Sequence, residues 1–209
     1  MQVDSINTGT SRKLSGRSFS GRTGIFKEPV TGPVTVGPLG LEGDAVLDAK
    51  HHGGPDQAVY LYRAEDYEWW SDQLGREIAP GTFGDNLTVR GLPGPGLGIG
   101  DRLQLPDLLL EVTAPRIPCN TLAERMDDPG FAKKFVRAER PGIYLRVIAP
   151  GSARTGDPVS LLPAAGDPLT TLDLYRDSYQ KLDAARIRQW LNLPIDMRTR
   201  AALQKKLGA

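Results

Sequence analysis

The only thiol of this 209-residue chain, Cys119, stands in a setting that favours reactivity. It lies in the segment TAPRIPCN (residues 113–120), directly after an apolar run. Two prolines stiffen the approach, and Arg116 precedes the cysteine by three residues. A nearby cation lowers the pKa of a thiol and favours the thiolate, which attacks electrophiles and binds soft metals. A lone cysteine is also commonly a small buried hydrophobe, and the residues alone leave both interpretations open.

A second candidate site is the segment KHHGGPDQ (residues 50–57). Gly53 and Gly54 can bring backbone N–H groups close to a ligand, and a concave set of such donors binds anions. His52 would add a hydrogen-bond donor or a proton carrier. The alternative is a plain turn before a strand, with His51 and His52 at the surface, and these residues taken alone favour it.

Two more polar side chains lie in turn-rich segments. Asn86, in GTFGDNLTV (residues 81–89), could hydrogen-bond the edge of a heterocycle, although asparagine is equally common as a structural residue of turns. Lys27, in TGIFKEPV (residues 23–30), could meet a phosphate, although a single lysine in a strand is more often only solvated. No one of these segments identifies a reaction.

Short strands joined by tight turns must position these side chains. The chain holds 24 Gly and 17 Pro, which argues against a helical bundle. Runs of strand length bounded by chain breakers occur at 34–36, 58–62, 102–105, 108–112 and 142–148. Gly-Asp pairs at 43–44, 100–101 and 156–157 resemble repeated strand entries. This pattern suits a closed or nearly closed β-barrel, which leaves no exposed strand edge.

Helical spacing appears between the strands and again at the end of the chain. We expect helices over 63–74 and 128–140, then three short helices over 169–179, 183–191 and 196–207. A unit of about 40 residues must pack on the barrel or on a partner to be stable. The predicted fold class is therefore mainly β: a closed β-barrel domain over residues 1–163, with a few helices, followed by a small three-helix domain over residues 169–209.

Composition and charge exclude several classes of function. One cysteine excludes an internal disulfide and any multi-cysteine zinc or iron–sulfur site, and two adjacent histidines exclude a His-rich cage. No run is apolar and long enough for a membrane span and no secretory leader is visible, so we expect a cytoplasmic protein. The formal net charge is +1, but residues 170–209 carry +4. This tail could bind nucleic acid, although we favour a solvated helical face packed on the barrel.

Six segments in this order resemble the MOSC domain, the molybdenum cofactor sulfurase C-terminal domain, and in particular its YiiM-like bacterial branch. They are TGIFKEPVTGPV, GLEGDAVLDAKHHGGPDQAVYLY, GTFGDNLTV, IGDRLQL, VTAPRIPCNTL and the pair GIYLRVIAPG and GDPVSLL. The resemblance covers roughly residues 1–163, and the helical tail resembles the small 3-alpha domain of that branch. No single segment is specific for the family, but the six segments in this order are.

The resemblance implies a pocket for molybdenum cofactor, a pterin dithiolene that carries Mo and a phosphate. In the family the cysteine is either the Mo ligand or a carrier of sulfane sulfur, and Cys119 matches it. The remaining matches to the family's motifs imply a cofactor-binding set, namely Lys27, His52, Gly53, Gly54, Asn86, Thr113 and Arg116. Asp85 replaces the family's usual Glu before Asn86, and His51 has no assigned role.

Enzymes similar to this branch reduce N-hydroxylated bases to amines, so the resemblance implies an oxidoreductase acting on a small molecule. No flavin, haem or iron–sulfur motif is visible, so electrons would come from a separate reductase. The alternative is a sulfur carrier with a persulfide on Cys119, a reversible oxidised state of the thiol. The residues do not decide between the two.

Overall fold

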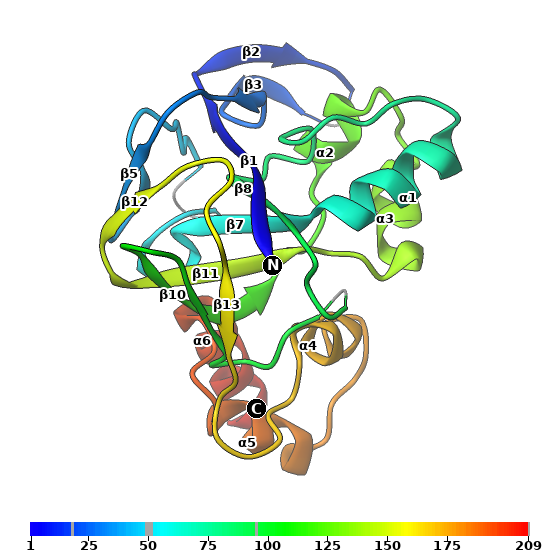
Figure 1. Ribbon diagram of the computed structural model, residues 1–209. Coiled ribbons are helices and arrows are strands. Elements are labelled where there is room, and N and C mark those ends of the chain that lie inside the picture. The colour runs from blue at the N-terminus through cyan, green and yellow to red at the C-terminus, as the bar shows by residue number, and fades with distance from the viewer. Residues whose placement is uncertain (18, 49–51, 95, 209) are drawn as a thin grey trace.

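A computed structural model describes residues 1–17, 19–48, 52–94 and 96–208. At its centre lies an eight-stranded sheet in the order β13-β9-β10-β11-β7-β8-β1-β4 (Figure 1). Within it, only the pairing of β7 with β8 is parallel. The bounds are β1 Gln2–Gly9, β4 Lys27–Pro29, β7 Val59–Arg63, β8 Leu87–Arg90, β9 Arg102–Gln104, β10 Leu109–Pro115, β11 Ile143–Ala149 and β13 Ser160–Leu162.

This sheet does not close into a barrel. Its two end strands, β13 and β4, do not pair with each other in the described ranges. The chain leading into β13 meets β1 at an isolated bridge between Gln2 and Pro158. Val3 N donates to Asp157 O there, Gly156 N to Val3 O and Val159 N to Met1 O, each at 2.9 Å, but these bonds do not make a strand pairing. The prediction of a closed barrel was therefore wrong, and the fold is mixed α/β with more strand than helix.

Smaller sheets and three helices flank the central sheet. Strands β5 (Val34–Gly37), β6 (Gly40–Leu41) and β12 (Gly151–Ala153) form one small sheet, and β2 (Arg12–Ser15) pairs with β3 (Ser20–Thr23) in another. Helices α1 (Ala64–Leu74), α2 (Asn120–Arg125) and α3 (Phe131–Ala138) gather on one side of the molecule (Figure 1).

None of the described helices combines the length and apolar character that a membrane crossing requires.

Local signals explain where these helices begin and end. The predicted helix 63–74 is α1, and Gly75 ends it in the left-handed conformation. The helix predicted over 128–140 is shorter, because Asp128 accepts a hydrogen bond from Gly130 N and forms a turn instead of an N-cap. Helix α2 was not predicted. It begins directly after Cys119, which is its N-cap residue.

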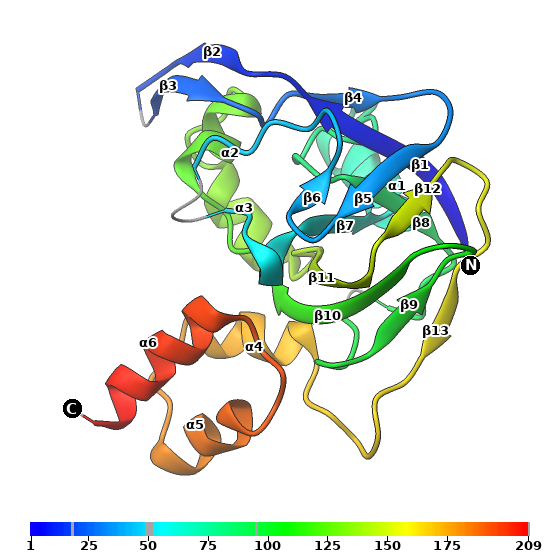
Figure 2. The same ribbon diagram turned by 90° about the vertical axis from the view of Figure 1, so that its left-hand side faces the viewer.

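The three helices at the end of the chain lie beside the central sheet, below β10 in Figure 2, and α4 contacts β10. They are α4 (Thr171–Asp177), α5 (Ala184–Leu191) and α6 (Met197–Leu207). Asp183 and Asp196, the first residues of the predicted ranges 183–191 and 196–207, are the N-caps of the last two. Trp190 and Leu203 belong to the same buried cluster as Leu110 of the sheet. The core therefore runs across the expected boundary, and the division into two domains stays a prediction.

A second buried cluster is rich in aromatic side chains and lies beside the candidate site. It includes Tyr62, Trp70, Phe83 and Phe135. Trp70 and Phe135 stack with their ring centroids 5.8 Å apart. Burial of each large apolar side chain contributes about 1.5–3 kcal/mol, so this cluster gives the site a rigid wall.

Candidate functional site

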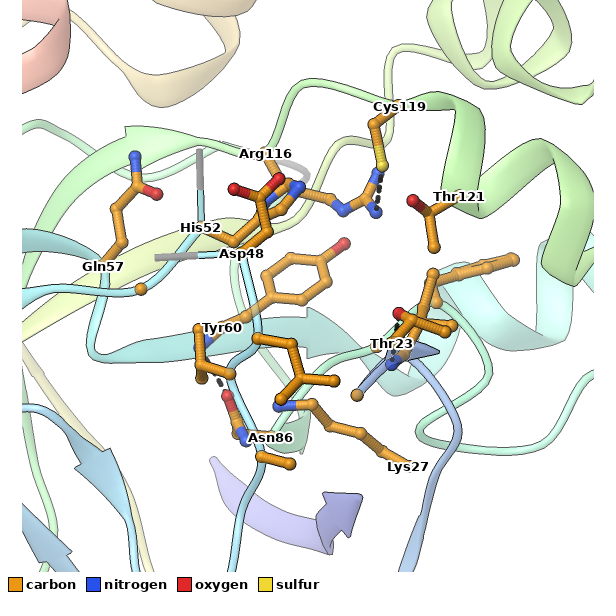
Figure 3. Close-up of a pocket in the computed structure, with 18 of the residues that line it drawn as sticks. Thr23, Lys27, Asp48, His52, Gln57, Tyr60, Asn86, Arg116, Cys119 and Thr121 are labelled. Carbon is orange, nitrogen blue, oxygen red and sulfur yellow. Dashed lines mark hydrogen bonds between the residues drawn. The ribbon is translucent and has the colours of Figure 1, made fainter. Parts of the chain in front are cut away.

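One pocket brings together most of the side chains that the sequence singled out. It encloses about 850 Å³ of empty space, its open mouth included. Six of the eight predicted site residues line it, namely Lys27, His52, Gly53, Asn86, Arg116 and Cys119. In Figure 3, Cys119 and Arg116 lie on the side opposite Lys27 and Asn86, and the ring of Tyr60 lies between them.

Cys119 lies at the start of α2, and two basic side chains, Arg116 and His52, interact with its sulfur. The Sγ atom lies 3.8 Å from Arg116 Nη2 (Figure 3). Burial raises the pKa of this thiol, but a hydrogen bond with His52 and the charge of Arg116 outweigh burial and lower the pKa to about 6. This pKa favours the thiolate at neutral pH and so favours the reactive thiol, one of the two interpretations that the sequence left open.

Arg116 is a buried cation without a carboxylate partner in the described residues. It is only 4% exposed, and its Nη1 donates to the carbonyl of the next residue, Ile117, at 3.5 Å. Its guanidinium lies over the rings of Tyr60 and Phe135, 5.7 and 5.9 Å from their centroids. These π faces hold the guanidinium in place without neutralising its charge. Within the protein, the Cys119 thiolate is the negative charge next to it.

The loop that carries His52 is held in a shape that requires glycine. Gly53 has a φ of +75°, and a Cβ atom there would lie 2.6 Å from Val46 Cγ1. His52 Nδ1 lies 3.2 Å from the hydroxyl of Tyr144. Pro55–Gln57 then forms a short 3₁₀ helix, η1, that leads into β7. His51, to which no role was assigned, lies outside the described residues.

Lys27 and Asn86 are bound to one acidic side chain. The Lys27 ammonium lies 2.5 Å from Asp44 Oδ2, and Asn86 Nδ2 donates to the same oxygen at 2.9 Å. Burial lowers the pKa of Lys27, and the Asp44 carboxylate opposes this effect. Gly9 N also donates to Asp44, at 2.9 Å. Both polar groups therefore hold the wall of the pocket, and their predicted contacts with a cofactor stay predictions.

Thr113 and Gly54 do not line the pocket. The Thr113 hydroxyl lies 2.6 Å from the carbonyl oxygen of Asp56 and 3.0 Å from that of Tyr144. It therefore ties the loop before β7 to β10 and β11. Gly54 has a φ of +85° and is the residue before η1. Thr113 and Gly54 therefore shape the backbone next to the pocket without lining it.

The pocket also contains residues that sequence reasoning missed. Tyr60, Tyr144, Gln57 and Thr121 line it. Both tyrosines lie in predicted strands, and their alternation with inward-facing neighbours could have assigned them to one face of the sheet. Nothing in the sequence shows that this face borders the cysteine loop, because the pairing of β7 with β11 brings it there.

Comparison with known proteins identifies the family. A model of the MOSC domain matches residues 48–160, more than half of the chain. The chain belongs to the MOSC domain family. Similar MOSC relatives include the Bacillus subtilis protein YflK, which is 36% identical over 160 residues, 77% of this chain and 72% of that protein. The resemblance drawn from the six segments is thereby confirmed.

The fold also matches a solved structure closely. The crystal structure of YiiM from Geobacillus stearothermophilus has a TM-score of 0.80 and 28% sequence identity, and the match covers 99% of this chain and 98% of that one. It includes the C-terminal helices. A protein of Gibberella moniliformis named "Reductase" is 34% identical over 66% of this chain, but the match covers only 25% of that larger protein.

Proposed function

We propose that this MOSC domain protein is an oxidoreductase that binds molybdenum cofactor in the pocket around Cys119. It would reduce N-hydroxylated compounds, such as hydroxylaminopurines, to amines. One observation carries the proposal: a thiol with a pKa of about 6 faces the pocket beside the buried cation Arg116. A soft metal prefers such a thiolate, and an anionic group prefers such a cation.

The donor set of the pocket fits this cofactor. In the described part of the chain, no group of three or more His, Cys, Asp or Glu side chains could hold a metal ion. A metal bound here through Cys119 would therefore take its other ligands from a bound molecule, as a pterin dithiolene provides. The guanidinium of Arg116 and the backbone at Gly53 are suited to anionic and polar parts of that molecule.

The chain's own groups would bind the substrate, orient it and move protons. When bound, the cofactor supplies two-electron chemistry at oxygen, and the protein shapes the site around it. Reduction of a hydroxylamine breaks the N–O bond, takes up two electrons and two protons, and releases an amine and water. His52, within 3.2 Å of the Tyr144 hydroxyl, lies where it can hand over a proton.

The electrons would come from a separate reductase. The relative named "Reductase" supports a redox role for this domain, and its additional length is consistent with further domains in that protein. The partner of the present chain would then be a redox protein rather than a membrane or a nucleic acid. A small-molecule substrate would enter through the open mouth of the pocket.

Metal analysis tests the proposal. The wild type, Cys119→Ala and Thr121→Ala would be produced in a host that makes the cofactor, and Mo would be measured by mass spectrometry. We expect near-stoichiometric Mo in the wild type and in Thr121→Ala, whose side chain lines the same pocket, and loss of Mo in Cys119→Ala. A loaded wild type that leaves hydroxylaminopurine untouched in the presence of a chemical reductant would remove the reductase assignment.

The low pKa of Cys119 also supports a second candidate, a sulfur carrier. The thiolate would hold a persulfide and pass its outer sulfur to an acceptor. Intact-mass spectrometry separates the candidates, because a persulfide adds about 32 Da, the mass of one sulfur atom, to the residue. That adduct on Cys119, in protein without Mo, would favour the carrier.

A further inference from the structure

The last helix of the chain, α6, is hydrogen-bonded to the pocket loop of residues 52–57. Arg198, in the first turn of α6, donates from Nη2 to the carbonyl of Gly53 at 2.9 Å and from Nη1 to Gln57 Oε1 at 2.8 Å. Gly53 and Gln57 both line the pocket. One side chain of the C-terminal unit therefore binds two points of the pocket wall, 145 and 141 residues away in sequence.

Neighbouring groups strengthen this junction. Met197 N donates to Asp56 Oδ2 at 2.8 Å, and Gln57 Nε2 donates to Asp196 Oδ1 at 3.4 Å. Asp196 N donates to the carbonyl of Thr113 at 3.3 Å. The start of α6 is thus joined both to η1, at the end of the His52 loop, and to β10.

We propose that Arg198 is a positioning residue of the pocket: α6 fixes the loop of residues 52–57, and with it His52, in the shape that receives the ligand. The inference rests on the proposed function only for the identity of that ligand. The C-terminal helices then have a role in the site and do more than cover the edge of the core.

The loop of residues 52–57 needs contacts from another element because glycine backbone can adopt many conformations. Gly53 and Gly54 both have positive φ and carry no side chains, so few local contacts restrict them. An arginine offers donors in a planar fork and can bond two acceptors at once. A lysine at the same position is a point donor on a flexible stem and would retain one acceptor at a time.

Arg200 provides a matched control on the same helix. It donates to the carbonyls of Leu191 and Leu193, at 2.8 and 2.6 Å, and so stabilises the helical unit away from the pocket. Replacement of either arginine by alanine removes at least two hydrogen bonds between described residues. Only the replacement of Arg198 releases the loop.

Hydrogen exchange on the purified full-length protein tests the inference without any cofactor. The reporters are the amides of His52, bonded to Asp48 O at 2.8 Å, and of Gln57, bonded to Gly54 O at 3.0 Å. We expect exchange at least about tenfold faster in Arg198→Ala, an intermediate rate in Arg198→Lys and the wild-type rate in Arg200→Ala. Wild-type rates in Arg198→Ala, or equal acceleration in Arg200→Ala, would overturn the proposal.

Mo content of protein from a cofactor-producing host gives the second readout. Arg198→Ala should retain less than about a third of the wild-type Mo, while Arg200→Ala should match the wild type. Faster loop exchange with full Mo retention would overturn the role of Arg198 in ligand binding. A wild type without Mo would instead refute the proposed cofactor, and the exchange rates would still decide whether Arg198 positions the loop.

Discussion

Replacing His52 with alanine should raise the pKa of Cys119 and so delay ionisation of the thiol. In the native pocket burial opposes the thiolate, and the hydrogen bond with His52 and the charge of Arg116 bring the pKa to about 6. A hydrogen bond to a charged group contributes about 1.5–3 kcal/mol, and one pKa unit corresponds to about 1.36 kcal/mol. His52→Ala should therefore shift the pKa upward by about one to two units, while Arg116 continues to favour the thiolate.

The rate of alkylation by iodoacetamide, followed from pH 4 to 10, measures this pKa as a midpoint. The midpoint is the correct quantity, because the nucleophilicity of a thiolate itself rises with its pKa. At pH 6 the ionised fraction should fall about 5- to 50-fold in His52→Ala, as follows from the shift of one to two units. Thr121→Ala, also a pocket variant, should keep the wild-type midpoint. A wild-type midpoint near 9, or no shift in His52→Ala, would refute the reasoning.

The difference between the pKa of Cys119 in the native protein and that of a free thiol makes the stability of the protein depend on pH. The native pKa of about 6 lies below the value of 9.0 for a free thiol, so the ionised thiol adds stability that is fully present above the unfolded pKa and is lost as pH falls through the native pKa. At pH 7 the contribution is about 1 kcal/mol. The stability difference between the wild type and Cys119→Ser, from denaturant unfolding, should therefore grow as pH rises from 6 to 9.

Three further predictions concern the support of the pocket. Gly53→Ala should lower the melting temperature and the Mo content more than Gly43→Ala, because both glycines have positive φ but a Cβ atom clashes only at the first. Asp44→Ala should cost about 3–5 kcal/mol in denaturant unfolding, because it leaves the buried Lys27 ammonium unpaired, and a loss below 1 kcal/mol would contradict this. Trp190→Ala should cost about 3–5 kcal/mol and lower one shared calorimetric transition, whereas two separate transitions would favour independent domains.

The sequence predicted much of the local structure and singled out residues that line one pocket. Strand-length runs and the helices expected from residues 63, 183 and 196 depend on neighbours in the chain, so periodicity and turn chemistry reveal them. Six of eight site residues line one pocket because the family's motifs had already collected them. Closure of the sheet was mispredicted, since strand entries do not reveal whether the end strands meet.

Contacts between distant segments could not be read from the sequence. Asp44 looked like the second residue of a turn, yet it accepts hydrogen bonds from Lys27, Asn86 and Gly9. Arg198 looked like one charge of a solvated helical face, yet it binds the pocket loop. In both cases the partner is chosen by the packing of elements far apart in the chain, which no local pattern encodes.

The charges of the two buried cations determine where an anion can bind. Lys27 already has a carboxylate partner in Asp44, so a phosphate placed there would compete with an existing ion pair and approach the Asp44 charge. Among the described residues Arg116 makes no ion pair with a carboxylate and lies beside the Cys119 thiolate, and a soft metal would draw on the charge of that sulfur. Arg116 is therefore the cation whose field remains available to a ligand. Although the family resemblance assigns both cations to the cofactor, we expect its anionic groups to lie nearer Arg116 than Lys27.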